Sequence, residues 1–593
     1  MSLSDKYSFP KPTENLLEHL LSSRLTDIAE KEYFLRPDWS SNHDPFLMHN
    51  MQAVVDRVWQ AIKENQHIVV YADYDADGVP GAVVLTNLLR KLNHINYSIH
   101  IPDRNLDGFG LNKRLCDQII SKSSDRAEPT LLITIDCGIS NTELIDYLQK
   151  NQIEVIVTDH HLPDMVDREV KLPNCLILDP KQPSCTYPCD VLCGTGVIFK
   201  LVQAMLTQQP DGYNIDPEWS KWLLDMVGIA TVCDMVPLTD ENRLFAYYGL
   251  KVLAKTKRPG LRTLIQLAGI DQYRITETDL GFGIGPRINA ASRLSSAMIA
   301  YTALSEAEPI AANKAATEMD SLNKRRKILT ASAAKYAYKK ADEQTRDGAK
   351  LLVIGNPDWQ LGIVGLVAGL VAQKYNLPTF IWTRITDTDG NTKYKGSARS
   401  GAGCSIHCLM SAAQTGQPAK VADPNQPPKK PTSRPFISFG GHDAAGGFVC
   451  SESQIHYLAE RLAPHVDYCT YDTAETKLPI DGTLELEHIN KDLWDTLCLL
   501  KPYGVGNMEP TFILQNLVID RIRLFGSDEQ HLSLYFRDSR FTSHEAIRFS
   551  YTDILDSAPQ VGDQITLICT IEQNTFNGAS NLRMKILDIE VNK

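Results

Sequence analysis

Four short runs of β-branched and aliphatic residues alternate with helix-forming stretches in the first half of the chain. The runs span residues 67–71, 131–135, 155–158 and 175–178. Unbroken apolar strands that alternate with helices are typical of a parallel sheet covered on both faces. We therefore predict an α/β fold whose ligands bind at the carboxyl ends of the strands.

The remainder of the chain divides by composition. A Pro-rich arm carries an amphipathic stretch near 16–28, an Ala/Lys/Glu-rich region predicts a long helix at 321–341, and a second α/β unit begins with an apolar run at 350–354. Short strands dominate the C-terminal part and indicate a small β-barrel. We expect an arm (1–45), a parallel-sheet domain (46–300), connecting helices (301–345), a smaller α/β domain with a Pro-rich insertion at 414–435 (346–466), and a barrel domain (467–593).

Composition excludes several classes of protein. With 43% hydrophobic and 22% charged residues, the 593-residue chain is globular rather than disordered. No apolar run is long enough to span a bilayer, and the N-terminus does not resemble a secretory signal, so we predict a cytoplasmic protein. The 13 cysteines are then expected to be reduced thiols. A net charge of −12 argues against a wholly basic nucleic-acid binder, although an enzyme with clustered cations and metal-binding acids remains compatible.

Acidic and imidazole side chains follow three of the predicted strands and one apolar helical stretch. The segments are DYDADG at 73–78, DCG at 136–138, DHH at 159–161 and CDMVPL at 233–238. Neighbouring parallel strands end at one edge, so these side chains should converge. Their mutual repulsion and desolvation require cations. Carboxylates with one or two imidazoles suit Mn²⁺ or Mg²⁺, and a pair of such ions would activate water and clamp a phosphoryl oxygen.

Other interpretations of these residues compete. Asp73 begins a DxDxDG pattern like that of a calcium loop, but the twelfth position is Val84 rather than Glu, and a strand precedes the motif. Asp136 taken alone fits a helix N-cap as well as a metal ligand. Paired histidines are also common on surfaces and in cores. The four segments taken together favour metal ligation.

Glycine-rich segments elsewhere place Arg, Ser or His beside exposed backbone N–H groups. They lie at 283–289, 396–400 and 440–447. Such turns suit phosphate binding, although ordinary turns with an exposed Arg explain the first two equally well. The basic run 324–327 is more typical of a solvated helix face than of a DNA track. The cysteines within 185–193 lack a fourth zinc ligand and are expected to be structural.

The complete set of motifs resembles the DHH phosphoesterase superfamily, and in particular its RecJ branch. Besides the four acidic segments, the resemblance rests on GPRINA at 286–291, GSARS at 396–400, FGGHDAAGG at 439–447 and KPYGVGNMEP at 501–510. It runs from about residue 45 to the end, with the motifs in the family's order. The resemblance implies a parallel-sheet DHH domain, a long connecting helix, a smaller α/β DHH-associated domain and a C-terminal OB-fold barrel.

The resemblance also implies a function. RecJ-type enzymes are single-strand-specific 5′→3′ DNA exonucleases that release 5′-mononucleotides by two-metal phosphodiester hydrolysis in recombination and repair. The chain would then use two Mn²⁺ or Mg²⁺ ions. It would act as a monomer, away from membranes, on single-stranded DNA with a 5′ end. Single-strand-binding protein and a RecQ-type helicase are the partners that the resemblance suggests.

Residue roles follow from matching positions. The metal ligands would be Asp73, Asp75, Asp136, His160 and Asp234. The residues needed for catalysis would be Asp77 and His161. The residues that hold DNA phosphates would be Arg104, Arg287, Asn289, Ser397, Arg399 and His442.

The chain departs from the family pattern in a few places. Tyr71 stands where many members carry His, which predicts weaker binding of the second metal ion. Ala72 and Ser292 replace usual glycines, and 414–435 resembles an insertion. The acidic C-terminal domain would need a local basic face with stacking aromatics to grip DNA. The candidate aromatics are Tyr503, Phe512, Tyr535 and Phe536.

Two alternative functions come from the same superfamily. One is a phosphodiesterase acting on short oligonucleotides or cyclic dinucleotides, but such proteins lack the C-terminal barrel that the segment at 501–510 indicates. The other is a non-catalytic scaffold that binds single strands. The nearly complete acidic set favours catalysis over the scaffold.

Overall fold

The computed structural model describes residues 3–8, 15–25, 28–124, 126, 129–166, 169–386, 390–415, 434–471, 478–526, 529–551, 554–555, 558–576 and 579–592. The chain forms two compact units. The smaller unit combines Met1–Asn42, Pro237–Tyr247 and Thr473–Lys593, and the larger unit combines His43–Val236 and Tyr248–Asp472. The predicted domain limits stay a prediction. Most of the Pro-rich insertion, 416–433, lies outside the described residues.

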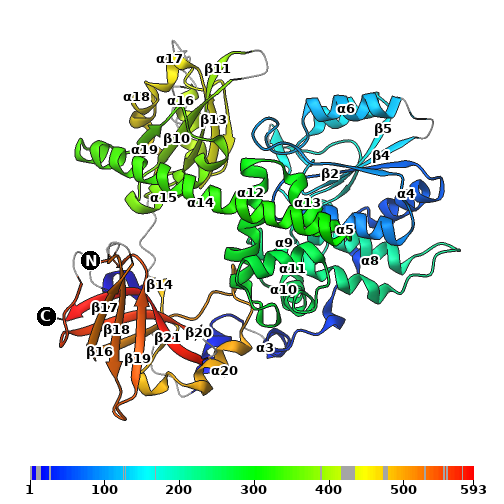
Figure 1. The fold of residues 1–593 in the computed structure, drawn as a ribbon. Helices are drawn as coiled ribbons and strands as arrows, with labels where there is room; N and C mark the ends of the chain where they lie inside the picture. Colours follow the sequence, from blue (N-terminus) through cyan, green and yellow to red (C-terminus); the bar gives the residue numbers. More distant parts are fainter. Residues whose placement is uncertain are drawn as a thin grey trace. The chain divides into compact units, whose positions relative to one another are not determined.

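A five-stranded parallel sheet organises the first part of the larger unit (Figure 1). Its order is β3–β2–β4–β5–β8, and every neighbouring pair is parallel. The strands are β2 (His67–Ala72), β3 (Tyr97–His100), β4 (Thr130–Ile135), β5 (Ile153–Thr158) and β8 (Leu176–Leu178). The four predicted apolar runs are thus strands of one sheet. The edge strand β3 was missed because it is half-buried and mixes polar with apolar residues.

Helices cover both faces of this sheet. On one face, α6 (Lys113–Ser124) and α7 (Thr142–Lys150) pack through Leu115, Ile119, Ile145 and Leu148. Against the other face lie α4 (Met51–Lys63), α5 (Gly78–Lys91) and α8 (Gly194–Thr207), as Figure 1 shows. Almost every residue of α5 and α8 is buried, since these helices are covered again by further helices. A small antiparallel hairpin pairs β6 (Asp164–Val166) with β7 (Glu169–Lys171).

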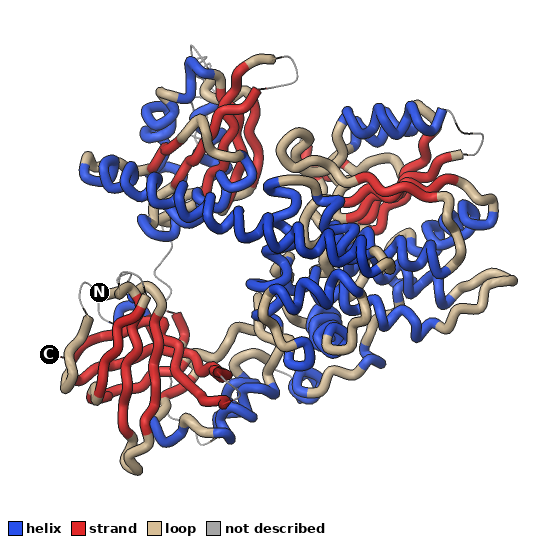
Figure 2. The backbone as a smooth tube through the Cα atoms, viewed as in Figure 1, coloured by secondary structure: helices blue, strands red, loops and turns tan. Residues whose placement is uncertain are grey.

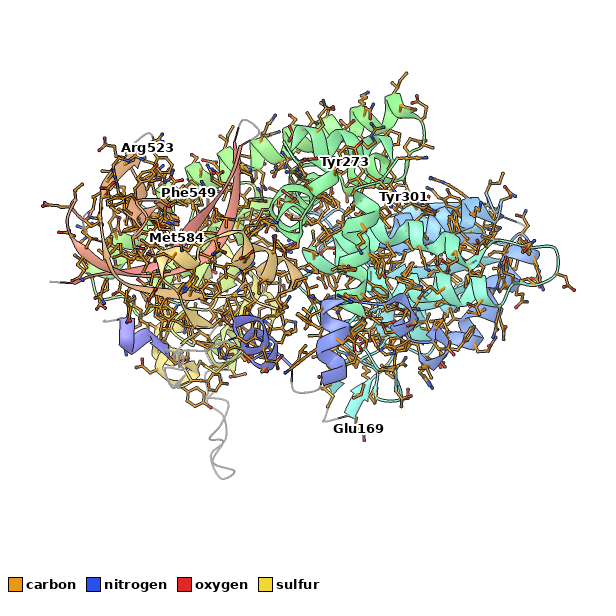
Figure 3. All side chains as sticks on the ribbon, turned by 90° about the horizontal axis from the view of Figure 1, so that it is seen from below. Glu169, Tyr273, Tyr301, Arg523, Phe549 and Met584 are labelled. Carbon is orange, nitrogen blue, oxygen red and sulfur yellow. A yellow bond between two sulfur atoms is a disulfide. The ribbon has the colours of Figure 1, made fainter. Side chains whose placement is uncertain are left out.

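A helical layer continues the larger unit. It contains α9 (Leu224–Cys233), α11 (Pro259–Leu267), a π-helix η5 (Asp279–Ile284), α12 (Gly285–Leu294) and α13 (Ala297–Ser305), while α10 (Asp240–Leu253) begins within 237–247. Tyr301 of α13 (Figure 3) donates a hydrogen bond to Thr86 of α5 over 3.1 Å. The segment 283–289, predicted as a Gly-rich turn, lies in η5 and α12 and is therefore helical. At Gly285 a Cβ would lie 2.4 Å from Cys233 Sγ, so close helix packing explains this glycine.

The predicted connecting helix is a single helix longer than expected. It is α14 (Pro309–Arg346), 38 residues long, with Pro309 in its first turn and the Glu308 carboxylate accepting N–H bonds at its start. The long helix predicted from the sequence spans only 321–341. In the structure, buried alanines such as Ala312 and Ala316 provide the packing face of the part before residue 321.

The second α/β part carries a mixed sheet in the order β12–β13–β11–β10–β9, of which only β9 and β10 are parallel. Its strands are β9 (Leu352–Gly355), β10 (Thr379–Thr386), β11 (Thr392–Arg399), β12 (Ser438–Gly441) and β13 (Ala445–Cys450). Its helices are α15 (Leu361–Tyr375), α16 (Ile406–Thr415), α17 (Glu452–Ile455), α18 (Leu458–Leu462) and α19 (Val466–Cys469). The expectation of a Gly-rich turn at 396–400 was wrong: most of it is strand β11, and a Cβ at Gly396 would meet the Phe448 ring at 2.2 Å.

The strands of the smaller unit form a barrel (Figure 2). They are mainly antiparallel, in the order β15–β16–β20–β21–β19–β18–β17. The strands are β15 (Gly482–Thr483), β16 (Phe512–Val518), β17 (Arg521–Phe525), β18 (His531–Arg537), β19 (Ser543–Arg548), β20 (Gln564–Phe576) and β21 (Ala579–Asn592). Further elements are α1 (Leu3–Lys6), β1 (Tyr7–Ser8), α2 (Leu16–Ser22), α3 (Ile28–Leu35), β14 (Leu478–Pro479) and α20 (Lys491–Leu499).

The barrel core corrects one expectation from the sequence. Phe512 and Phe536, proposed as stacking platforms, are fully buried in it and cannot meet a base. Alternation along each strand turns them to the inner face. The arm contributes to the same core through Leu20 of α2 and Phe34 of α3.

One cysteine pair contradicts the expectation that all thiols are reduced. Cys408 of α16 and Cys469 of α19 form a disulfide, with their Cα atoms 5.6 Å apart. Their 61-residue separation gave no sequence signal, since packing of the two helices alone brings them together. Among the described residues, none of the helices has the length and apolarity needed to cross a membrane.

Candidate metal centre

Acidic and imidazole side chains converge at the carboxyl ends of three adjacent strands. Asp73 follows β2, Asp136 follows β4 and His160 lies just after β5, while Asp234 caps the C-terminal end of α9. Three groups of potential ligands have donor atoms within 4.8 Å of one another. They are Asp73–Asp75–Asp136, Asp77–His160–Asp234 and Asp136–His160–His161. All seven residues that the sequence assigned to metal binding and catalysis therefore meet in one place.

The His160 imidazole lies in the middle of the cluster. Its Nε2 atom is 3.1 Å from Asp136 Oδ1, 3.6 Å from Asp234 Oδ2 and 3.8 Å from Asp77 Oδ2. Both of its ring nitrogens are buried without a hydrogen-bond partner, and so are one oxygen of Asp73 and one of Asp136. Buried polar atoms normally have partners. Carboxylate oxygens and imidazole nitrogens that are buried without a hydrogen-bond partner fit one or two hard divalent cations, because such ions bind these donor types.

The electrostatics of the cluster also call for cations. Burial, and then the neighbouring carboxylates, raise the pKa values of Asp73 and Asp136 well above the usual range for Asp. The same causes raise the pKa of Asp234 to about 9. Burial lowers the pKa of His160 and keeps its ring neutral, the form that binds metals. Without added positive charge, the Asp234 carboxyl would hold a proton at neutral pH.

The 73–78 loop is held by its own backbone and by α12. The Asp75 Oδ1 atom accepts N–H bonds from Asp77 at 2.8 Å and Gly78 at 3.1 Å. A Cβ at Gly78 would lie 2.4 Å from the Asp73 carbonyl oxygen, so this tight loop requires glycine. Asn289 Oδ1 accepts the Ala76 N–H at 3.1 Å, which gives Asn289 a loop-positioning contact.

The N-terminus of α8 orients a second acid of the cluster. The Asp77 carboxylate accepts N–H bonds from Gly194 at 2.6 Å and Thr195 at 2.7 Å. Both N–H groups belong to the first turn of α8, where no carbonyl of the same helix accepts them and where the helix dipole is positive. A Cβ at Gly194 would lie 2.6 Å from the Asp136 Cβ, so only glycine lets α8 approach. Sequence analysis missed this contact, although glycines at 194 and 196 opening an apolar helix were a signal.

A hydrogen bond to the Asp159 carboxylate orients His161. The His161 Nδ1 atom lies 2.7 Å from Asp159 Oδ1, which also accepts the His160 N–H at 2.8 Å. Burial alone would lower the pKa of His161, but the Asp159 carboxylate outweighs it and raises the pKa. The edge of the half-exposed Phe109 ring lies against the imidazole, with centroids 5.2 Å apart. His161 is thereby oriented with its Nε2 atom left for a ligand or substrate.

Cations gather beside the Asp73 end of the cluster. The Arg104 guanidinium lies over the Tyr74 ring at 4.8 Å, and Arg399 donates to Ser397 Oγ at 2.6 Å. Burial, and then repulsion from Arg104, lower the pKa of Arg399 and, to about 9, that of Arg293. An anion bound among these guanidinium groups would relieve their mutual repulsion. The structure thus groups the predicted Arg104, Ser397 and Arg399 with a residue the sequence analysis had not assigned to the site, Arg293.

Two predicted phosphate residues are placed differently. The Arg287 guanidinium lies 2.9 Å from the Asp320 carboxylate and donates to the Gly283 carbonyl at 2.7 Å, so internal partners engage it. His442 is exposed after β12 and is not a member of the potential ligand groups formed by the described residues. Their phosphate roles stay predictions. Tyr71 is fully buried and donates its hydroxyl to the Gly110 carbonyl at 3.0 Å, within the core rather than into the cluster.

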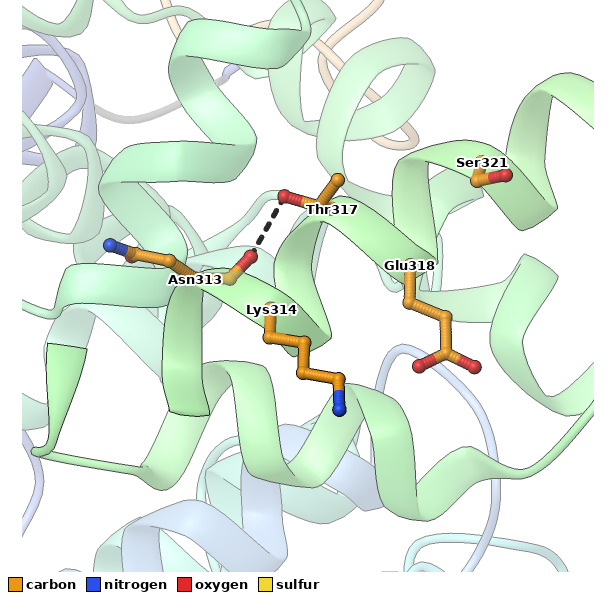
Figure 4. Close-up of a pocket in the computed structure, with 5 residues that line it drawn as sticks. All are labelled: Asn313, Lys314, Thr317, Glu318 and Ser321. Carbon is orange, nitrogen blue, oxygen red and sulfur yellow. Dashed lines mark hydrogen bonds between the residues drawn. The ribbon is translucent and has the colours of Figure 1, made fainter. Parts of the chain in front are cut away.

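A hollow of about 500 Å³ lies elsewhere, on the first half of α14 (Figure 4). The five residues that line it are Asn313, Lys314, Thr317, Glu318 and Ser321. All of them belong to one helix, and the Thr317 hydroxyl is already bonded to the Asn313 carbonyl at 2.9 Å. None of the potential metal ligands contributes to it. This hollow is therefore separate from the candidate metal centre.

Comparisons with known proteins agree with this geometry. Residues 67–231 match the DHH family, N-terminal domain, and residues 480–588 match the RecJ OB domain. The single-stranded-DNA-specific exonuclease RecJ of Bacillus subtilis is 30% identical over 582 residues, which is 98% of this chain and 68% of the relative. The Haemophilus influenzae RecJ is 28% identical over 560 residues, 92% of each chain.

Solved structures share the fold. The crystal structure of Thermus thermophilus RecJ in complex with Mn²⁺ has a TM-score of 0.75 at 23% identity, over 98% of this chain and 76% of that one. A crystal structure of exonuclease RecJ bound to manganese has a TM-score of 0.58 at 25% identity, over 73% of this chain and 98% of that one. The segment that matches the DHH family contains β2, β4 and β5, from whose ends most of the cluster projects.

Proposed function

Because the chain belongs to the RecJ family of DHH phosphoesterases, we propose that it is a single-stranded-DNA-specific exonuclease that removes 5′-mononucleotides from the 5′ end. The observation that carries the proposal is the cluster of seven acidic and imidazole side chains, four of them buried, in which Asp73, Asp136 and His160 have buried polar atoms without a hydrogen-bond partner. Neither a pure binding scaffold nor a structural role needs so many desolvated acids in contact.

The cluster would hold two Mn²⁺ or Mg²⁺ ions through Asp73, Asp75, Asp136, His160 and Asp234. Asp136 would be the shared ligand, because it is the carboxylate that belongs to two ligand groups and it has two oxygens to offer. When bound, the ions supply Lewis-acid charge and a nucleophilic water for in-line attack on phosphorus. Asp77 is fixed by the α8 N-terminus and lies beside His160, so it would hold the neighbouring metal ligands in position. His161, oriented by Asp159, presents Nε2–H to the scissile phosphate or to the departing 3′ oxygen.

The neighbouring cations would set the direction of digestion. Arg104, Ser397 and Arg399, joined by Arg293, would hold the terminal 5′-phosphate beside the Asp73 end of the cluster. A terminal phosphate held there places the next phosphodiester at the carboxylates, so one nucleotide leaves per cut. Asn289 would act through the 73–78 loop. Arg287 and His442 remain proposed phosphate contacts that would require a change of partner or position on DNA binding.

The barrel provides an additional surface for the strand. The Arg523 guanidinium of β17 lies 5.7 Å from the Phe525 ring, which packs against Phe549, a residue that is 51% exposed (Figure 3). An exposed aromatic group with a cation nearby suits stacking on single strands. Single strands with free 5′ ends arise when a duplex is unwound. A RecQ-type helicase and single-strand-binding protein in the cytoplasm are therefore the partners we propose for recombination and repair.

One assay tests the proposal. The protein is incubated with Mn²⁺ and either a 5′-phosphorylated single strand, a blunt duplex of the same sequence, or a dinucleotide. We expect mononucleotides to be released from the 5′ end of the single strand far faster than from the other substrates. Faster hydrolysis of the dinucleotide would favour a short-oligonucleotide phosphodiesterase instead. Binding of the strand without cleavage would favour a scaffold.

A further inference from the structure

Lys181 follows the fourth strand whose carboxyl end borders the candidate metal centre. β5 and β8 pair in parallel, and the Asp159 N–H donates to the Leu178 carbonyl at 3.0 Å. Lys181 lies three residues beyond Leu178, beside the segment that carries His160 and His161. Strand ends at this edge of the sheet carry the cluster itself, so the position of Lys181 is one where ligand-binding side chains gather.

The backbone at Lys181 is fixed from within the core. Asp179 is fully buried, and its Oδ1 atom accepts the Lys181 N–H at 2.7 Å. The Lys181 side chain is half-buried. Within the described part of the chain, its ammonium has no carboxylate within the 4 Å of an ion pair and no hydrogen-bond acceptor. A lysine anchored in this way but left unpaired is available to an anionic ligand.

The cluster has cations on two different sides. The Arg104 guanidinium lies over the ring of Tyr74, the residue after Asp73. Lys181 follows β8, which pairs with β5 on the side away from β4 and β2, and His160 at the end of β5 has its Nε2 atom 3.6 Å from Asp234 Oδ2. The arginines therefore lie at the Asp73 end of the cluster, and Lys181 lies at the end formed by His160 and Asp234. A polyanion that crosses the cluster from one end to the other would meet a cation before the carboxylates and another after them.

We propose that Lys181 binds the DNA phosphate that follows the scissile one, between the second and third nucleotides. This inference rests on the proposed function and deepens it. With the terminal phosphate at the arginines and the scissile phosphate at the carboxylates, the next phosphate of the strand reaches the Lys181 end. One ammonium–phosphate contact there holds the strand after the first cut and favours substrates longer than a dinucleotide.

The experiment pairs a protein change with a matching substrate change. Wild type, Lys181→Met and Lys181→Arg are compared on a 5′-phosphorylated single strand and on the same strand with a neutral methylphosphonate between nucleotides two and three. Release of the first nucleotide is measured in single turnover over a range of protein concentrations and salt. Lys150→Met is the control, because Lys150 is exposed at the end of α7, away from the carboxyl ends of the strands.

We expect Lys181→Met to raise the half-saturating concentration about tenfold on the normal strand, as loss of one charge-assisted contact does. The slope of log affinity against log salt concentration should become less steep by about 0.7, the value for one phosphate contact to a single strand. On the methylphosphonate strand the variant and wild type should be equal, because the contact is already absent. Lys181→Arg should recover most of the loss, and Lys150→Met should match wild type.

Two results would overturn the inference while leaving the exonuclease intact. One is an active wild type whose Lys181→Met variant has unchanged half-saturation on the normal strand. The other is an equal penalty from Lys181→Met on both strands, which would indicate that the lysine only tunes the cluster. A wild-type protein that releases no nucleotide from either strand would instead overturn the proposed function, and this inference with it. Circular dichroism melts of each variant verify that it is folded.

Discussion

At the scale of single residues, each carboxylate has an environment that assigns it a different task. Asp136 has a left-handed backbone with φ of 61° and an orphaned buried oxygen, and it belongs to two of the ligand groups. Asp77 has both oxygens occupied by helix N–H groups. Asp159 is taken up by His161 and backbone donors. These three aspartates therefore have different tasks: Asp136 is the shared ligand, Asp77 supports the ligands from the α8 N-terminus, and Asp159 orients His161.

The shared ligand gives the first prediction. Asp136→Asn preserves shape but removes the charge that both ligand sites would use. Turnover should fall by several orders of magnitude, and calorimetry should detect loss of Mn²⁺ binding. Asp146→Asn, an acid of similar sequence position on α7, is the control and should behave as wild type. Turnover near that of wild type in Asp136→Asn would mean that the metal centre is assigned wrongly.

Proton release gives the second prediction. Burial and neighbouring carboxylates raise the pKa of Asp234 to about 9, so the metal-free carboxyl is protonated at neutral pH. A bound ion must displace that proton. Mn²⁺ affinity should therefore increase as the pH rises from 6 towards about 9, with protons released at the lower pH values. Calorimetry in buffers of different ionisation enthalpy measures the release; a pH-independent affinity would contradict it.

The arginine group gives the third prediction. Arg399→Ala should weaken a 5′-phosphorylated strand about tenfold or more, while a strand with a 5′-hydroxyl loses much less, because only the former presents the terminal dianion. Half-saturating concentrations of the two strands measure the difference. Arg384→Ala, an exposed residue of the neighbouring strand β10, should leave both unchanged. Equal losses on the two strands would exclude a terminal-phosphate pocket formed by Arg399.

At the scale of elements, the approach of α8 to the end of β4 makes the cluster possible. Gly194 has no Cβ where one would collide with Asp136, and Gly196, two residues further on in the same helix, has only ordinary contacts at 3.5 Å or more. Gly194→Ala should displace the helix end from Asp77 and Asp136 and lower both Mn²⁺ affinity and turnover at least tenfold. Gly196→Ala should retain activity and slightly favour the helix. Comparable activity of the two variants would show that the helix end does not shape the site.

At the scale of the whole molecule, segments distant in sequence share cores. In the smaller unit, the buried Arg243 guanidinium lies over the Phe34 ring at 3.5 Å and donates to the carbonyls of Phe34, Leu500 and Lys501. One side chain thus joins the arm, the 237–247 segment and the entry to the barrel.

Arg243→Met should remove these bonds and leave buried carbonyls without donors, at a cost of about 3 kcal/mol to that unit. Hydrogen exchange of peptides from β16 and β20 in the full chain should accelerate accordingly. Arg537→Met breaks only an exposed pair with Asp520 and should cost less than about 1 kcal/mol. Equal exchange in the two variants would mean that Arg243 does not hold the unit together.

Local composition was enough to predict the strands that are apolar throughout and the acids that follow them, because burial on both faces requires apolar residues and because parallel strands end at one edge. The parallel sheet and the convergence of Asp73, Asp136 and His160 followed from it. Other features could not be predicted in this way: the N–H groups that brace Asp77, the place of Arg293 among the arginines, the burial of Phe512 and the Cys408–Cys469 pair. They depend on contacts between residues far apart in the chain, set by how helices and sheets pack, and no local periodicity encodes them.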